Sequence, residues 1–356
     1  MGKLAVYKYL SFMVLVVTIL TTVFIIMGLF GGHSNPATGT ALALTVYILP
    51  LLIVFDFILL LFWLLRRRWH WAAIPGVTLL CCIPYIGTLY QLGWFNSNSD
   101  SKSGINVATY NVAMFGREIN GFKAEDILSV MKSHQVDVLC MQEYMERSGD
   151  KINSDNYLNY FTAKATGRGD MMVFSRYPII DSLTIDFSKI GKTNNSAMWA
   201  DIDVNGKMIR VFNVHLETTG INRTLSHTAR QQQNNGVAVE KSTLLRTIYG
   251  RYTQGMVVRA QQAEVVAAEI KKSPHPVIVC GDFNDVPYSY VYRTMKGDLV
   301  DGFKECGKGF MYTFREGLKH VRIDYIFHSE GLEGVNYYKH EATYSDHFPV
   351  FMRIAM

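Results

Sequence analysis

The stretch PVIVCGDFND, residues 276–285, joins a short apolar run to an abruptly polar end. Residues 277–280 are apolar, and Gly281 separates them from Asp282 and Asn284. A short apolar run rich in β-branched residues is typical of a strand in a buried sheet. Asp and Asn also favour turns, so GDFND alone fits an ordinary loop after a strand. Its meaning therefore depends on what the other strands carry.

Polar residues follow several other predicted strands in the same way. From residue 105 onward, short apolar strands alternate with helical patterns such as AEDILSVMKSH (124–134) and RAQQAEVVAAEIKKS (259–273). This alternation predicts an α/β domain with buried sheets. The polar residues at the strand ends are Asn111, Gln142, Glu143, Asn213, His215, Asp282, Asn284, Asp324, Asp346 and His347. Because strand ends of such sheets share an edge, we expect these side chains to gather at one ligand-binding rim.

The chemistry of this set indicates a divalent cation. The set contains four carboxylates, those of Glu143, Asp282, Asp324 and Asp346. Carboxylate and amide oxygens are hard ligands that suit Mg²⁺ or Mn²⁺. Packed carboxylates without a cation would raise one another's pKa, and a neighbouring histidine can handle a proton near neutral pH. The combination predicts metal-assisted hydrolysis of a phosphate ester.

Six segments in this order resemble the endonuclease/exonuclease/phosphatase superfamily, whose members are deoxyribonuclease-I-like. They are NVATYNV (106–112), MQEY (141–144), FNVHLE (212–217), GDFND (281–285), RIDYIF (322–327) and SDHFPV (345–350). The resemblance covers about residues 104–356, and GDFN and SDH are specific in combination. It implies an α/β (α+β) four-layer sandwich, in which two packed mixed β-sheets are flanked by helices.

The resemblance also implies which residues hold the metal. Glu143 would be the most direct ligand, with Asn111 beside it. Asp346 would be a further ligand on the metal side, while its neighbour His347 faces the substrate. Adjacent residues of a strand point to opposite faces, so the two can serve two parts of one site.

Five residues would carry the reaction according to the same resemblance. Asp282 would position or deprotonate the attacking water, and Asn284 would hold this water or a phosphate oxygen. His347 would act at the scissile phosphate, oriented by Asp324. His215 would donate a hydrogen bond to the phosphate as negative charge builds. Asn284 and His215 are therefore also the candidate substrate-binding residues.

The first 95 residues differ in composition from the rest. Three apolar stretches run over about 10–30, 41–65 and 71–94, and each reaches the ~20 residues that a membrane-spanning helix needs. We expect a membrane domain at 1–95, a polar linker at 96–104 and a catalytic domain at 105–356. The first stretch is too long for the core of a signal peptide, and two more stretches follow it.

Basic residues predict the orientation of these spans. Lys3 and Lys8 precede the first span, and three consecutive arginines at 66–68 separate the second from the third. The loop at 31–40 has no Lys or Arg, so the positive-inside rule places it outside. Three crossings then predict a bacterial cytoplasmic-membrane protein with a periplasmic catalytic domain. Asp56 lies within the second span, as a functional residue or as one bonded to a neighbouring helix.

A long polar segment, residues 218–258, follows His215 and precedes the predicted helix at 259–273. Its cations and the first residue of that helix are Arg223, Arg230, Lys241, Arg246, Arg251 and Arg259. Cations beside a hydrolytic site favour an anionic substrate, although a solvated flap explains them equally well. Arg259 and Gln262 match an R-x-x-Q pattern of the superfamily, which we interpret as structural support.

Three functions remain open at this stage. The leading one is a membrane-anchored, divalent-metal-dependent phosphodiesterase that acts on nucleic acid or on a phospholipid or sphingolipid head group. The others are a phosphomonoesterase on a soluble phosphate and a non-catalytic membrane scaffold. The intact set of Glu143, Asp282, Asn284 and His347 argues against the scaffold. The expected partners are an anionic phosphate ester and the lipid bilayer, with no protein partner.

Overall fold

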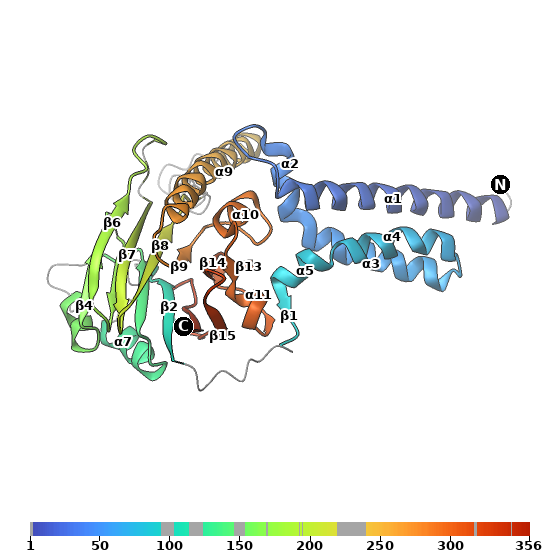
Figure 1. Ribbon diagram of the computed structural model, residues 1–356. Helices are drawn as coiled ribbons and strands as arrows, with labels where there is room; N and C mark the ends of the chain where they lie inside the picture. Colours follow the sequence, from blue (N-terminus) through green and yellow to red (C-terminus); the bar gives the residue numbers. More distant parts are fainter. Residues whose placement is uncertain are drawn as a thin grey trace.

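A bundle of apolar helices lies beside a domain of two β-sheets in the computed structural model of the chain (Figure 1). The structure describes residues 3–93, 103–113, 124–145, 154–168, 170–191, 193, 195–218, 240–316, 319–342 and 344–356. The predicted linker at 96–104 lies mostly outside the described residues. Gly104, its last residue, already begins the first strand of the larger domain.

The helical bundle contains two helical segments that are long and apolar enough to cross a membrane, Val6–Gly31 and Thr40–Leu65. The helices are α1 (Lys3–Gly31), α2 (Thr40–Leu44), η1 (Thr45–Ile48), α3 (Leu49–Leu65), α4 (Trp69–Cys81) and α5 (Ile83–Leu89). Asp56 is fully buried in this bundle, and its carboxylate has no hydrogen-bond partner among the described residues.

The third predicted span differs from the single helix expected over 71–94. Helices α4 and α5 meet at a bend of 49°, so they are a third span only if the bent pair counts as one. Pro84 stands in the first turn of α5 and has no N–H to donate to the preceding turn, which explains the break. The helix also ends at Leu89, because Tyr90–Gln91 form strand β1.

The larger domain is built on two six-stranded sheets. Their orders are β15-β16-β2-β3-β5-β4 and β10-β14-β9-β8-β7-β6. The first sheet contains β2 (Gly104–Asn111), β3 (Val138–Gln142), β4 (Ala163–Thr166), β5 (Met172–Ser175), β15 (Glu333–Lys339) and β16 (Val350–Ala355). The second contains β6 (Ile179–Ile185), β7 (Ser196–Val204), β8 (Lys207–His215), β9 (Val277–Asp282), β10 (Val300–Asp301) and β14 (Asp324–His328). Both sheets are mixed, since β2–β3 and β8–β9 are parallel pairs and the other pairs are antiparallel.

Helices flank the two packed sheets, as the predicted sandwich requires. One core cluster joins the facing surfaces of the sheets, for example Cys140 of β3 with Cys280 of β9. Helix α7 (Ala124–Ser133) packs on the outer face of the first sheet. Helices α9 (Lys241–Lys271) and α10 (Tyr290–Lys296) pack on the outer face of the second. The remaining elements are η3 (Ser154–Asn159), α11 (Gly302–Cys306), β11 (Gly309–Phe310), β12 (Phe314–Glu316) and β13 (Lys319–Val321).

Helix α9 begins well before the helix predicted from the sequence. The sequence assigns residues 218–258 to a long polar segment before the predicted helix, and residues 219–239 of it lie outside the described residues. From Lys241 onward, however, the chain is one continuous helix through Lys271. Arg259 lies in its middle and is fully buried, in line with a structural role for this residue.

The register of β8, β9 and β14 aligns the polar strand ends. His215 of β8 pairs with Asp282 of β9, and Asp282 pairs with Asp324 of β14. Gly281 makes this alignment possible. A Cβ at this position would lie 1.9 Å from the carbonyl oxygen of Val214, and the φ of Gly281 is +140°. Only glycine allows β8 and β9 to approach so closely at this point.

We expect Gly281→Ala to lower the free energy of unfolding by about 3–5 kcal/mol, because backbone strain and a steric clash add up. Gly191→Ala is the matched control, since Gly191 has the same φ of +140° and a Cβ added there would meet nothing within 4 Å. The control should lose only about 1–3 kcal/mol from strain. Denaturant unfolding of the full-length protein in detergent measures both, and equal losses would contradict the steric explanation.

Candidate active site

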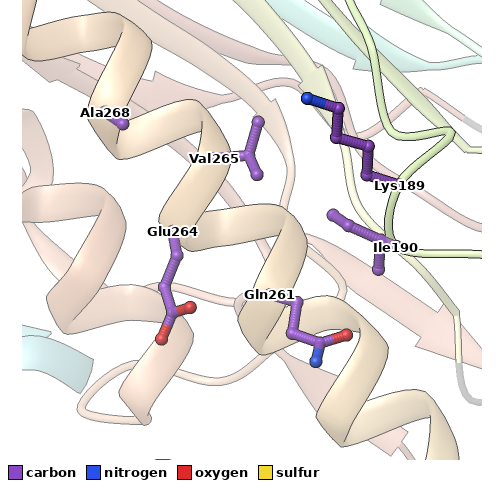
Figure 2. Close-up of a pocket in the computed structure, with 6 residues that line it drawn as sticks. All are labelled: Lys189, Ile190, Gln261, Glu264, Val265 and Ala268. Atoms are coloured by element: carbon purple, nitrogen blue, oxygen red, sulfur yellow. The ribbon is translucent and has the colours of Figure 1, made fainter.

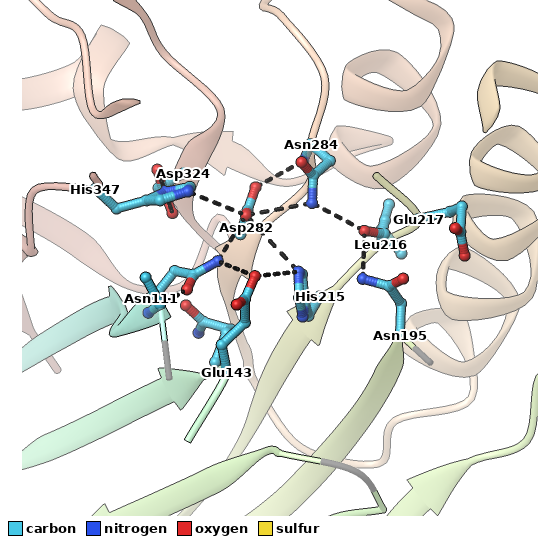
Figure 3. Close-up of polar contacts among 12 residues, drawn as sticks. Asn111, Glu143, Asn195, His215, Leu216, Glu217, Asp282, Asn284, Asp324 and His347 are labelled. Carbon is cyan, nitrogen blue, oxygen red and sulfur yellow. Dashed lines mark hydrogen bonds and ion pairs between the residues drawn. The ribbon is translucent and has the colours of Figure 1, made fainter. Parts of the chain in front are cut away.

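Asp282 lies at the centre of the polar residues that the strand ends bring together (Figure 3). Its Oδ2 atom accepts hydrogen bonds from Nδ2 of Asn111 at 3.0 Å and from Nδ2 of Asn284 at 3.2 Å. The same atom lies 3.7 Å from Nε2 of His347 and 3.9 Å from Nε2 of His215. Burial raises the pKa of Asp282 to about 6, against the opposing effect of His347. A carboxylate with this pKa is ionised at neutral pH yet remains a usable base.

His347 and Asp324 form a buried pair beside Asp282. Nδ1 of His347 lies 3.0 Å from Oδ2 and 3.2 Å from Oδ1 of Asp324. Burial alone lowers the pKa of His347, but the charges of Asp324 and then Asp282 outweigh it and raise this pKa to about 10. The imidazole is therefore a cation at neutral pH, with Nε2 directed toward Asp282. Phe314 packs edge-on against its ring, with centroids 4.9 Å apart.

Asn111 and Glu143 approach Asp282 from the first sheet. Nδ2 of Asn111 bridges Asp282 and Glu143, at 3.4 Å from Oε1 of Glu143. Oδ1 of Asn111 accepts a hydrogen bond from the backbone N–H of Ala113. Glu143 follows β3 with a φ of +52°, in the left-handed region that non-glycine residues rarely adopt. Such strain is typical of functional positions, where the surrounding structure holds it in place.

His215 completes the group from the end of β8. Its Nε2 atom lies 3.8 Å from Oε1 of Glu143 and 3.9 Å from Oδ2 of Asp282. Its Nδ1 atom is buried and has no hydrogen-bond partner among the described residues. The ring therefore directs one nitrogen at both carboxylates.

Asn284 is held in place by hydrogen bonds to the ends of β8 and β9. Its φ of +53° is left-handed, which asparagine tolerates better than most residues. The side chain donates to Oδ2 of Asp282 and, at 3.0 Å, to the carbonyl oxygen of Leu216. Asn195, which the sequence did not single out, donates to the same carbonyl at 3.0 Å (Figure 3).

Asp346 is the one predicted site residue that the structure leaves at the margin. Its side chain is exposed, and the hydrogen bond found for its carboxylate among the described residues is with the hydroxyl of Ser345, at 3.2 Å, while its charge also acts on His347. Ser345, by contrast, is buried. Its hydroxyl donates to the backbone oxygen of Asn111 at 2.8 Å and accepts from the N–H of His347 at 3.1 Å. Ser345 thus connects the end of β2 to the loop before β16, a role that the sequence did not indicate.

The donor set fits a divalent cation. One ligand atom each of Asp282, Asp324 and His347 lies within 4.8 Å of the other two. His347 is a poor ligand while it is protonated and paired with Asp324, so the oxygens of Glu143 and Asp282 are better suited. Asn111 would have to turn its amide to present its oxygen, giving up the hydrogen bond from Ala113. Oxygen-rich donors of this kind match Mg²⁺ or Mn²⁺ more closely than zinc.

A separate hollow of about 410 Å³ lies between α9 and the loop before β7 (Figure 2). It is lined by Lys189, Ile190, Gln261, Glu264, Val265 and Ala268. None of these residues belongs to the predicted site, and Oε1 of Glu264 already accepts from the hydroxyl of Tyr290 at 2.6 Å. The hollow is therefore separate from the group of residues around Asp282.

Two family profiles match the chain. Residues 108–347 match the Endonuclease/Exonuclease/phosphatase family, and this segment contains every predicted site residue. Residues 11–89 match a domain of unknown function, DUF8431, which corresponds to the helical bundle. No curated protein matches the chain.

Several solved structures share the fold of the larger domain. An endonuclease/exonuclease/phosphatase from Bacteroides vulgatus has a TM-score of 0.52 and 19% identity, and the match covers 72% of this chain and 100% of that one. D. rerio TDP2 complexed with single strand DNA product has a TM-score of 0.51 and 16% identity, over 71% of this chain and 100% of that one. At these identities the likeness shows the fold.

We expect the His347 imidazole of the metal-free protein to titrate near pH 10, because Asp324 and Asp282 stabilise its charged form and raise its pKa to about 10. NMR of selectively labelled histidines measures this. Asp324→Asn should lower the pKa of His347. His134 is an internal contrast, since burial and then His340 lower its pKa.

The raised pKa also has a consequence for stability. A histidine with a raised folded-state pKa stabilises the protein fully below its unfolded pKa of about 6.5, and this contribution is lost as pH rises through about 10. Denaturant unfolding with chelator should show this decline in the wild type and a smaller decline in His347→Gln. A His347 signal that titrates below pH 7 would contradict the ion pair.

Proposed function

The chain belongs to the endonuclease/exonuclease/phosphatase family, and from that premise we propose that it is a membrane-anchored, divalent-metal-dependent phosphodiesterase. Members of this family are hydrolases that act on phosphate esters, and the chain retains a compact set of groups suited to that chemistry. The proposal adds the metal, the diester bond and the place of action.

Asp282 is the observation that carries the proposal. It is a buried carboxylate with a pKa of about 6, so it is ionised at neutral pH and can still accept a proton. Asn284 donates to it, and two imidazoles lie within 4 Å of it. We assign Asp282 to positioning and deprotonating the attacking water, with Asn284 holding this water or a phosphate oxygen.

The two histidines supply hydrogen bonds to the phosphate, and His347 also supplies positive charge. His347 is cationic at neutral pH, and Asp324 fixes its Nδ1–H, so that Nε2–H is available to a phosphate oxygen. His215 directs its Nε2 atom toward the same space. Donors held in place before the reaction stabilise charge that builds in the transition state.

Glu143 and Asn111 would hold the divalent cation, with Asp346 as a further candidate at the margin. When bound, the cation supplies Lewis-acid stabilisation of the phosphate and offsets the repulsion between the carboxylates. Mg²⁺ and Mn²⁺ suit the oxygen donors.

The arrangement of the bundle supports an extracytoplasmic catalytic domain. Arg66 lies 4.1 Å over the ring of Tyr7, so the N-terminal lysines and the arginine loop share one end of the bundle. At the other end, both Tyr47 and Thr88 contact the larger domain. The bent pair α4–α5 therefore returns to the end where α1 finishes, which favours three crossings. Together with the positive-inside rule, this supports a catalytic domain outside the cytoplasm.

Both nucleic acid and lipid head groups carry phosphodiesters, and a substrate panel distinguishes them. Single-stranded DNA, RNA, sphingomyelin and phosphoinositides, each with Mg²⁺, cover these classes. A ratio of activity on bis-p-nitrophenyl phosphate to activity on p-nitrophenyl phosphate separates the diesterase from the monoesterase.

We predict that Mg²⁺-dependent hydrolysis of bis-p-nitrophenyl phosphate falls about 10²–10³-fold in His347→Ala, because removing one positioned donor to the developing negative charge costs about this much. The matched control is His275→Ala. His275 precedes β9 at the end opposite to Asp282, and its one ion pair among the described residues is with Asp201 at 3.9 Å. The control should retain wild-type kcat. Chelation of the metal should abolish activity in the wild type and in the control. Full activity of His347→Ala or of the chelated wild type would refute the mechanism.

We also predict the side of the membrane. An alkaline phosphatase reporter fused after residue 100 should be active in the periplasm of a bacterial host. The same reporter fused after residue 67 should be inactive, because that loop carries the arginines. The opposite pattern would overturn the extracytoplasmic assignment.

A further inference from the structure

The beginning of the second span contacts the loop that carries the proposed catalytic residues Asp282 and Asn284. Tyr47 lies in η1, at the beginning of the second span, and its hydroxyl donates to Oδ1 of Asp285 at 2.7 Å. Its ring also packs edge-on against Tyr252 of α9, with centroids 5.5 Å apart. Asp285 is the last residue of the GDFND segment and follows Asn284 directly.

Asp285 is a buried carboxylate, 4% exposed, whose charge is balanced by the buried guanidinium of Arg259. Nε of Arg259 donates to Oδ2 of Asp285 at 3.1 Å. Oδ1 receives the Tyr47 hydroxyl and the backbone N–H of Val286. The backbone oxygen of Asp285 accepts from the hydroxyl of Tyr325 at 2.8 Å. Together these donors fix both carboxylate oxygens and the backbone oxygen of Asp285.

The contacts continue directly into the active site. Arg259 also donates to the backbone oxygen of Glu217 at 2.7 Å, and Leu216, the residue before it, accepts from Asn284. Asn284 in turn donates to Asp282. The hydroxyl of Tyr47 thus binds the residue next to Asn284. Three hydrogen bonds, by way of Asp285 and Arg259, connect it to the backbone oxygen of Glu217. The left-handed φ of Asn284 makes the position of this loop dependent on its neighbours.

Other contacts keep the bundle and the larger domain in register. Asn35 donates to Oε1 of Glu264 at 2.8 Å and to the hydroxyl of Tyr290 at 3.1 Å. Strand β1 pairs with β11, so Tyr90 lies opposite Phe310. These contacts do not touch Asp285, and they can be altered separately from Tyr47.

We propose that Tyr47 is a positioning residue of the active site, and that the membrane domain therefore sets the catalytic loop at 282–286 as well as anchoring the enzyme. The inference rests on the proposed function, because the loop matters through the hydrolysis that Asp282 and Asn284 carry out. A membrane domain with this role makes catalysis depend on how its spans are packed against the larger domain.

Tyr47→Phe tests the proposal, because it removes the hydroxyl and keeps the ring against Tyr252. In the full-length protein in detergent, with Mg²⁺ and bis-p-nitrophenyl phosphate, kcat should fall roughly tenfold while KM stays within about twofold. This small, soluble substrate reports the chemical step without any effect of membrane attachment. Hydrogen exchange of the amides at 283–286 should become faster, since Asp285 has lost one of its donors.

Two control variants separate positioning from docking and from a general effect on the bundle. Tyr9→Phe makes the same chemical change on α1, where the side chain is 63% exposed. Asn35→Ala removes contacts between the bundle and the larger domain without touching Asp285. Both should keep wild-type kcat and wild-type exchange in the loop.

A double-mutant cycle with Asp285→Asn adds a second measurement. If Tyr47 acts through Asp285, the two losses in kcat are not additive, because either change breaks the same contact. Wild-type kcat and exchange in Tyr47→Phe overturn this inference alone, as does an equal loss in Asn35→Ala. A wild-type protein that hydrolyses no phosphodiester overturns the proposed function together with this inference.

Discussion

The burial of the Asp282 carboxylate is the constraint on which the site depends. A buried carboxylate is unfavourable unless hydrogen bonds and opposite charges surround it. Asn111 and Asn284 supply the hydrogen bonds, and His347 is the nearest positive charge. These partners come from strand ends of both sheets. Satisfying this buried carboxylate therefore requires the two sheets to meet at this rim. The burial that makes Asp282 costly to place also gives it a pKa suited to catalysis.

The close approach of strands β8 and β9 brings the end of β8 beside Asp282. The parallel register sets His215 beside Asp282, and the missing side chain of Gly281 lets Val214 come close enough for it. Helix α9 then supports the turn that follows. Arg259 reaches the backbone of Glu217, and Gln262 accepts from the N–H of the same residue at 2.7 Å. A single helix thus fixes the strand end that carries His215.

The sequence predicted the features that arise from local patterns. Apolar strands with polar ends led to an α/β domain with one rim, and the family resemblance implied the two mixed sheets. The structure gathers at this rim Asn111, Glu143, His215, Asp282, Asn284, Asp324 and His347. The catalytic and metal-binding roles given to them stay predictions. Long-range contacts left no comparable pattern. Ser345 and Asn195 act through backbone atoms of strands far away in sequence, and a lone serine or asparagine carries no signal of that.

Other misses have a similar physical origin. The first half of α9 was not recognised, because its larger apolar residues, such as Leu245 and Tyr249, are exposed and form no stripe facing a sheet. Hydrophobic periodicity arises from the burial of one helix face. A part of a helix that extends beyond its sheet has no buried face and is therefore not detected by periodicity. The sequence predicts the third span as one helix, because hydropathy depends on composition alone. It does not detect the bend that Pro84 introduces.

The contact between Tyr47 and Asp285 shows why a neutral donor suits the junction between the two domains. Arg259 already balances the charge of Asp285, so a second cation from the bundle would leave an excess positive charge in a buried place. A tyrosine hydroxyl satisfies the remaining oxygen without changing the local charge. It also brings a ring that packs on Tyr252, which orients the hydroxyl. The junction can therefore join the spans to the loop at 282–286 without adding a charge near Asp282 and the other residues of the proposed site.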